Sequence, residues 1–388
     1  MKVDLPHAIQ LSDPPDLSLP LPNPTRVSSA AGDFLVSNVL LSGGMRTGVN
    51  LIIIDSGAVR AAICPTRGMG LWKARIDQLA LGWNSPVQGP IHPNFVPLSE
   101  ANGLGWLDGF DELLVRCGLQ SFGAPDFSAQ GTLLYPLHGR IGNLPARSVE
   151  LNLDAEHSLL EISGTVLETR FLQYNLRLTA KYVFAWGQPV IEVHDTVANL
   201  SAQETDIQML YHINIGSPIL TEGARLHTSS RRAVARNAHA ASDLARWDTY
   251  QPPTPGYEEQ VYFFQSVGDD KGWATAMLAA ENRQTGFAVH YDATTLPFFT
   301  QWKNTVAESD GYVTGLEPGT GFPNPRSFEQ TKGRLVTLAG GGSVQFQLKL
   351  EGVGNAQRLQ NISNQVEQTR SSDRLDTSAF DPEWCVPR

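Results

Sequence analysis

A carboxylate near the end of the chain is placed where it could act as a base. Glu317 follows an apolar residue and precedes the segment 318–325, which contains three prolines and two glycines. Such a segment cannot extend a sheet, so we expect Glu317 at the end of a strand, at the mouth of a pocket. Trp302 would supply a flat apolar surface nearby. A base, an acid, an aromatic surface and hydroxyl-binding groups suffice for sugar chemistry without a cofactor.

His212 lies in a segment whose two faces differ. Alternate residues of 207–215 form one apolar face, and the other face carries Gln208, Leu210, His212 and Asn214. In a strand these sets point to opposite sides, so the face with His212 could line a cavity. A solvated outer face is the alternative, and alternation alone leaves both open. The segment Gly216-Ser217-Pro218 ends the strand soon after His212, which favours a site at a sheet rim.

Two segments combine an arginine with glycines. In His138-Gly139-Arg140 the glycine would let the backbone approach a ligand, and Arg140 offers a planar fork of donors. A turn with an exposed arginine is the simpler alternative. Arg67, beside Gly68, repeats the pattern directly after a predicted strand.

Other candidate groups are weaker. Lys303 could form a Schiff base if an apolar site lowered its pKa, but donation to substrate oxygens or pairing with a carboxylate is favoured. The acidic cluster in 108–112 is typical of a solvated turn. No HxH, HExxH or CxxC spacing occurs, so no metal site is predicted. No glycine-rich phosphate loop is present, which argues against a nucleotide cofactor.

Composition limits the possible partners. The 388 residues carry a net charge of −10, and no basic run is available to neutralise phosphates, which argues against nucleic acid. An acidic surface also gives no attraction to anionic membranes. No segment has the length of a transmembrane helix or the pattern of a signal peptide. We therefore expect a soluble, cytoplasmic protein.

The pattern along the chain predicts one large all-β unit between two tails. Residues 1–30 hold six prolines and are expected to form an extended arm. Residues 356–388 are expected to form a polar tail with a short helix over 356–369. In 31–355 apolar and polar residues alternate repeatedly, for instance along 176–184, 189–197 and 344–350. This pattern predicts a large antiparallel sandwich with few short helices.

Four short patches resemble the galactose mutarotase (aldose 1-epimerase) superfamily, and in particular its uncharacterised aldose-epimerase-like branch. One of them, Arg67-Gly68-Met69, resembles that branch, and the other three resemble mutarotase motifs. Mutarotases carry a His-Gly-Gly stretch, an Asn-His-x-x-Phe-Asn-type strand and a Leu-Glu-x-x-x-x-Pro loop. Here His138-Gly139 is similar to the first, Tyr211–Asn214 to the second, and Leu316–Asn324 to the third. The resemblance extends over roughly residues 35–350. It implies a β-supersandwich with the site on the concave face of one sheet.

The resemblance also implies roles for individual residues. Glu317 would be the general base that removes the anomeric hydroxyl proton, and His212 the acid that protonates the ring oxygen. This requires an ionised Glu317 and a protonated His212, which their mutual attraction would favour. His138 would steady the substrate. The remaining residues expected to bind substrate are Arg67, Arg140, Asn214, Gln301, Trp302 and Lys303.

The chain also departs from the mutarotase pattern. Arg140 stands where a second glycine is usual, and Arg67-Gly68-Met69 does not reproduce the Asn-Arg element of standard mutarotases. A pocket with Arg67, Arg140 and Lys303 would suit an anionic, phosphorylated or oxidised sugar. The expected activity is an isomerase that interconverts sugar anomers without a cofactor, as a monomer or homodimer. Lyase or epimerase chemistry on a uronate or keto sugar, and non-catalytic sugar binding, are the alternatives.

Overall fold

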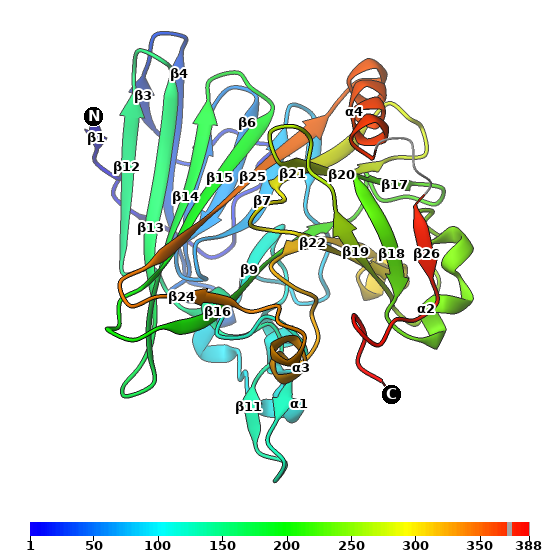
Figure 1. Ribbon diagram of the computed structural model, residues 1–388. Helices are drawn as coiled ribbons and strands as arrows, with labels where there is room; N and C mark the ends of the chain where they lie inside the picture. Colours follow the sequence, from blue (N-terminus) through cyan, green and yellow to red (C-terminus); the bar gives the residue numbers. More distant parts are fainter. Residues whose placement is uncertain (371–374, 388) are drawn as a thin grey trace.

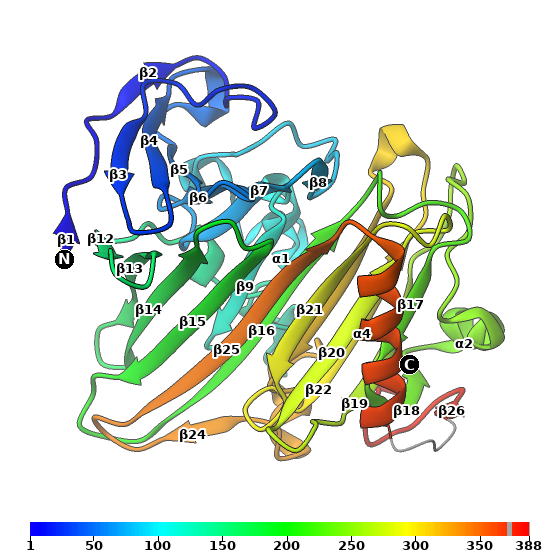
Figure 2. The ribbon, with the colours of Figure 1, turned by 90° about the horizontal axis from the view of Figure 1, so that it is seen from above.

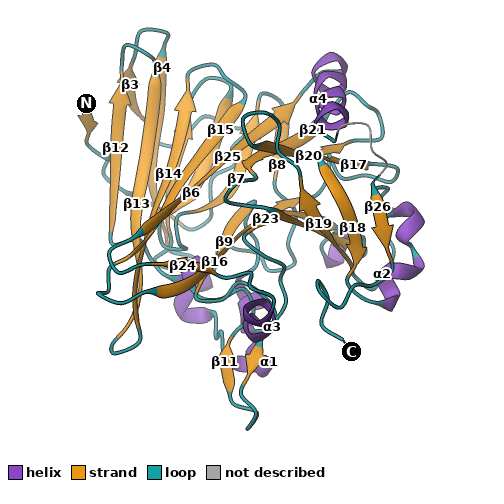
Figure 3. Cartoon of the chain, viewed as in Figure 1, coloured by secondary structure: helices purple, strands orange, loops and turns teal. Residues whose placement is uncertain are grey.

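Two large β-sheets pack against each other in the computed structural model, which describes residues 1–370 and 375–387 (Figures 1 and 3). The first is nine-stranded, in the order β1-β12-β13-β14-β15-β25-β21-β20-β17. The strands of this sheet, in that order, span Lys2–Val3, Ser148–Asp154, Leu159–Arg170, Tyr174–Ala185, Val190–Asn199, Ser343–Val353, Gly286–Asp292, Trp273–Ala279 and Arg225–Thr228.

The second sheet carries the candidate site and has 15 strands. Its main path is β2 (Ile9–Leu11), β4 (Asp33–Leu41), β5 (Asn50–Asp55), β6 (Val59–Cys64), β7 (Gly70–Ile76), β9 (Leu114–Leu119), β16 (Thr205–Ile215), β23 (Val313–Gly319), β22 (Phe298–Asn304), β19 (Gln260–Ser266), β18 (Ser230–Ala235) and β26 (Asp376–Ser378). Three short strands flank this path: β3 (Thr25–Ser28), β8 (Leu79–Leu81) and β24 (Val336–Leu338). The two edge pairings β2–β4 and β18–β26 are parallel.

The core lies between the two sheets because each long strand turns one set of alternate residues inward. On β14 these include Leu178, Ala180 and Tyr182, and on β16 they include Met209 and Tyr211. All of them belong to one continuous cluster of buried side chains. The other face of β16, which carries His212, therefore lies on the outer surface of its sheet, as the alternation in the sequence predicted.

Helices are short and peripheral in the described part of the chain. They are α1 (Glu100–Gly103), α2 (Ala238–Ser242), α3 (Arg326–Thr331) and α4 (Ala356–Thr369), and none is long and apolar enough to span a membrane. Helix α4 covers the range expected from the sequence and lies over β20 and β17 (Figure 2). Asn355 caps its first turn, and Leu359, Ile362 and Val366 pack on the outer side of the nine-stranded sheet.

Both tails are joined to the sheets. The N-terminal arm adds β1, β2 and β3 to sheet edges. Near the other end, β26 pairs with β18. A hairpin of β10 (Asp126–Phe127) and β11 (Leu133–Tyr135) projects with α1 below β9 and β16 (Figure 1).

Candidate active site

A cavity of about 300 Å³ opens on the outer face of the 15-stranded sheet. Its floor comes from β16, β19, β22 and β23, and its walls come from the segment 104–110, the residues before β10, and the loop after β23. The polar residues that line it are His138, His212, Arg236, Glu259, Thr300 and Glu317. Its volume lies at the lower end of the range usual for small-molecule sites.

His212 and Glu317 face each other across neighbouring central strands. Ile213 pairs with Leu316 in the antiparallel ladder of β16 and β23, which places His212 opposite Glu317. Their exposed fractions are only 4% and 2%, and His212 Nε2 lies 3.3 Å from Glu317 Oε1. A side chain at Gly315 would collide with the carboxylate, since a Cβ there would lie 2.3 Å from Glu317 Oε1.

Asn214 fixes the tautomer of His212. The Asn214 side-chain amide donates to the backbone carbonyls of Glu112 and His212, so its Oδ1 must be the acceptor in the 2.7 Å bond with His212 Nδ1. His212 Nδ1 therefore carries a proton, and Nε2 is the atom that can exchange a proton in the pocket. The sequence placed Asn214 among the substrate-binding residues. In the structure it is fully buried and orients the histidine.

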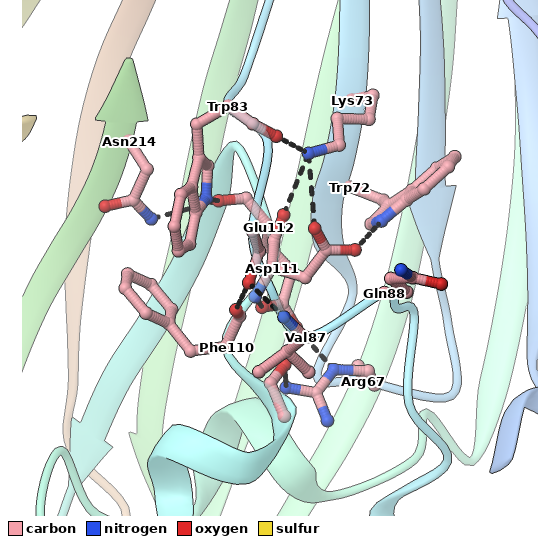
Figure 4. Close-up of polar contacts among 12 residues, drawn as sticks. Arg67, Trp72, Lys73, Trp83, Val87, Gln88, Phe110, Asp111, Glu112 and Asn214 are labelled. Atoms are coloured by element: carbon pink, nitrogen blue, oxygen red, sulfur yellow. Dashed lines mark hydrogen bonds and ion pairs between the residues drawn. The ribbon is translucent and has the colours of Figure 1, made fainter. Parts of the chain in front are cut away.

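A buried polar network behind the pocket supports this arrangement (Figure 4). The carbonyl of Glu112 accepts from Asn214 and from the Trp83 indole, while its carboxylate pairs with Arg67. Asp111 accepts from the indole N–H of Trp72 at 2.6 Å. The solvated turn predicted over 108–112 is thus wrong for Asp111 and Glu112, because both carboxylates are buried among donors.

Arg67 lies outside the cavity, which corrects its expected role in binding hydroxyls. Besides Glu112, its guanidinium donates to the carbonyls of Ile91 and Gly109 and to Asn143 Oδ1. The side chain is completely buried, and these partners occupy its donors. Arg67 therefore holds the segment that carries Glu112.

His138 reaches the pocket through an unusual backbone conformation. Both His138 (φ 56°) and Gly139 (φ 71°) are left-handed, and a Cβ at residue 139 would lie 2.0 Å from the carbonyl oxygen of Ser121. Glycine is therefore required at 139. His138 Nδ1 donates to the carbonyl of Phe122 at 2.8 Å, which leaves Nε2 as an acceptor. Its ring centroid lies 5.1 Å from that of His212.

Three aromatic rings surround the two histidines. The centroid of Trp106 lies 4.5 Å from that of His138, and the centroids of Phe110 and Trp302 lie 5.1 and 5.6 Å from that of His212. The sequence predicted only Trp302 here. Trp106 lies in a 3₁₀ helix over Gly105–Gly109 and Phe110 follows it, and because neither belongs to a strand pattern, nothing local pointed to them.

An ion pair that was not predicted from the sequence lines the opposite wall. Arg236 donates to Glu259 Oε1 at 2.8 Å, and the Trp302 indole donates to Glu259 Oε2 at 2.6 Å. Although burial opposes the shift, these donors lower the pKa of Glu259, so its carboxylate is ionised. Glu259 thereby fixes the Trp302 ring and contributes a negative charge near Glu317.

Burial pushes His212 and Glu317 towards their neutral forms. Desolvation, with a smaller contribution from Glu259, raises the pKa of Glu317 well above its usual value. Desolvation and the neighbouring His138 lower the pKa of His212 well below its usual value. Desolvation also lowers the pKa of His138, to about 4. Both shifts oppose the expected ion pair, because loss of hydration disfavours the charged forms of Glu317 and His212.

Gln301 and Lys303 do not reach the cavity, because strand alternation turns both away from Trp302. Gln301 donates to the carbonyl of Trp247 and to the Tyr250 hydroxyl. Lys303 donates to the carbonyls of Arg246 and Thr249, and burial lowers its pKa to about 8. Thr300 and Trp302 point to the other side and line the cavity.

Arg140 also lies away from the cavity lining. Its guanidinium donates to the Tyr174 hydroxyl at 3.2 Å. Of the three cations expected in the pocket, none lines it. The cation that does line it is Arg236, which is paired with Glu259.

Comparison with known proteins supplies a family and a fold. A family model described as a domain of unknown function (DUF4432) matches residues 46–351. A provisionally assigned aldose 1-epimerase from Klebsiella pneumoniae is 31% identical, covers 92% of this chain and 94% of its own, and superposes with a TM-score of 0.88. No functionally curated protein matches the chain in sequence.

More distant solved structures share the fold. A galactose mutarotase-like protein from Clostridium acetobutylicum is 13% identical, with a TM-score of 0.56 over 82% of this chain and 98% of its own. Galactose 1-epimerase from Lactobacillus acidophilus is 12% identical, with a TM-score of 0.53 over 82% and 99%. These likenesses confirm the mutarotase-like β-supersandwich predicted from the sequence.

Proposed function

The chain belongs to the DUF4432 family, and we propose that it is an isomerase that interconverts the anomers of a sugar. One observation carries the proposal. Among the described residues, three buried polar atoms of the cavity lining have no hydrogen-bond partner: Glu317 Oε1, Thr300 Oγ1 and Arg236 Nε. Glu317 Oε1 is near His212 but lacks the alignment of a hydrogen bond. Buried polar groups normally find partners, and a hydroxylated ligand would supply them.

The pair of His212 and Glu317 suits ring opening because it shares one transferable proton. Opening requires a base to take the proton of the C1 hydroxyl and an acid to protonate the ring oxygen as the C1–O bond breaks. Rotation about C1–C2 and closure on the other face then give the second anomer. We assign Glu317 as base and His212 as acid, after the proton has moved from Glu317 to His212 Nε2. Each positioned proton transfer contributes about 10²–10⁴-fold in rate.

The charge balance of the cavity favours an uncharged sugar. The anionic sugar was inferred from Arg67, Arg140 and Lys303, and the structure places all three outside the cavity lining. Arg236 is balanced by Glu259. The rings of Trp106 and Trp302 offer apolar surfaces of the kind that pack on the C–H faces of a pyranose.

Exchange between α and β anomers, measured by saturation-transfer NMR, tests the proposal. The panel would contain neutral aldoses, uronates, 6-phosphates and keto sugars. We expect acceleration for a neutral aldose and a loss of at least about 10²-fold in Glu317→Gln. Glu258→Gln is the matched control, since this exposed residue precedes the pocket residue Glu259. No acceleration with any sugar, or full activity in Glu317→Gln, would refute the proposal.

A further inference from the structure

The segment Asp381–Cys385, here named the C-terminal clamp, packs on the loop that follows Glu317. Trp384 in this clamp is only 9% exposed, and its ring lies 4.8 Å from that of Phe322. Phe322 in turn stacks on Phe263 at 4.6 Å. The clamp therefore adds an aromatic layer to the loop that forms one wall of the cavity.

Hydrogen bonds attach the same loop to the clamp. The amide of Asn324 donates to the carbonyl of Trp384 at 2.9 Å and to Glu329 Oε1 at 2.8 Å. Arg334 donates to both oxygens of Glu329 and to the carbonyl of Glu383. The position of Asn324 thus depends jointly on α3 and on the clamp.

A short series of contacts runs from this loop to His138. Pro323 lines the cavity, and its carbonyl accepts from the N–H of Ala124 at 3.1 Å. Gly123 packs so closely that a Cβ there would lie 1.8 Å from the carbonyl oxygen of Asn324. The carbonyl of Gly123 accepts from the N–H of His138 at 2.9 Å. Displacing the loop would therefore displace His138.

The clamp also contacts the opposite wall. Arg232 pairs with Asp381 at 2.6 Å, and its guanidinium lies 5.0 Å from the centre of the Trp384 ring. Cys385 Sγ lies 3.6 Å from the carbonyl oxygen of Ala235, the residue before Arg236. The clamp thus connects the wall that carries Pro323 with the wall that carries Arg236.

We propose that Trp384 is a positioning residue, which sets the place of His138 and of the loop after Glu317 for the reaction. The expected effect on the reaction rests on the proposed function, whereas the expected effect on the position of His138 does not. The clamp lies outside residues 46–351, which the family model matches.

Two readouts on Trp384→Ala test the inference. The first is the pH titration of the His138 ring, followed by NMR of protein labelled with ¹⁵N at histidine. Burial holds its pKa at about 4 in the intact pocket, and we expect the titration to move towards the usual range once the wall is loosened. The second is the rate of anomer exchange, where we expect kcat/KM to fall by about 10- to 10²-fold. Trp384→Phe should restore both.

Trp186→Ala is the matched control. Trp186 packs edge-on against Phe34 and does not line the cavity, and the same substitution removes a similar aromatic contact. We expect it to lower the melting temperature while the His138 titration stays as in the wild type. If Trp384→Ala does not fold, Asp381→Asn carries the test, since it weakens the link to Arg232 and keeps the indole.

The inference is overturned if the clamp variants titrate and react as the wild type does, or if Trp186→Ala changes the His138 titration equally. A wild-type protein without mutarotase activity would refute the proposed function alone. The His138 titration would still decide whether the clamp positions the pocket.

Discussion

Glu168 on β13 is a buried carboxyl group whose ionisation should weaken the fold. It is 1% exposed, and its Oε2 accepts from the N–H of Leu119 at 2.7 Å. Oε1 has no hydrogen-bond partner among the described residues. Burial raises the pKa of Glu168 from its usual 4.5 to about 7, although the Leu119 N–H and the charge of Arg140 oppose the shift.

The sign and size of the effect follow from proton linkage. Between about pH 4.5 and 7 the folded state keeps a proton on Glu168 that the unfolded state has lost, so the free energy of unfolding falls as the pH rises. The pKa difference of about 2.5 corresponds to about 3 kcal/mol of unfolding free energy. This contribution is fully lost by about pH 8. Glu168→Gln keeps an acceptor for the Leu119 N–H and cannot ionise, so it should lack this decline.

Urea unfolding of both proteins from about pH 4 to pH 8 provides the assay. The unfolding free energy of Glu168→Gln, relative to wild type, should rise by about 3 kcal/mol across this range. The exposed Glu156→Gln is the matched control and should show a constant difference. A constant difference for Glu168→Gln as well would show that Glu168 ionises as readily in the fold as in the unfolded chain.

Three further predictions concern the site and its support. Asn214→Ala frees the His212 ring and should slow anomer exchange by about 10²-fold; an unchanged rate would contradict the orienting role. Arg116→Met leaves Asp195 buried without its bidentate partner and should cost about 3–5 kcal/mol in urea unfolding; a cost below about 1 kcal/mol would refute this. The acid limb of the rate profile reports addition of a second proton to the catalytic pair. Because burial lowers the pKa of His212, kcat should fall only well below pH 6.5; a fall centred near 6.5 would indicate a solvated histidine.

The sequence was informative about features that can be read from the residues of a single strand. Alternation along β16 correctly separated the core face from the face that carries His212. Glu317 does line a cavity, but β23 continues to Gly319, so the predicted end of the strand at Glu317 is wrong by two residues. The structure brings these two residues together with His138 and Trp302.

The sequence was uninformative where partners come from distant strands. Arg236 and Glu259 meet because β18 pairs with β19, and no local motif announces an ion pair between them. The family resemblance implied that Gln301 and Lys303 share the pocket with Trp302, although period two sends neighbours to opposite faces. For Arg67, the sequence showed an arginine beside glycine but not the buried Glu112 that neutralises it.

The proposed catalytic pair and the entrance of the cavity belong to different parts of the fold. His212 and Glu317 lie on β16 and β23, in the interior of the 15-stranded sheet, where opening requires global unfolding. Leu104 and Leu107 at the entrance belong to a peripheral segment and are 41% and 45% exposed. Substitutions in this segment would change the shape of the entrance while leaving His212 and Glu317 in place on the sheet.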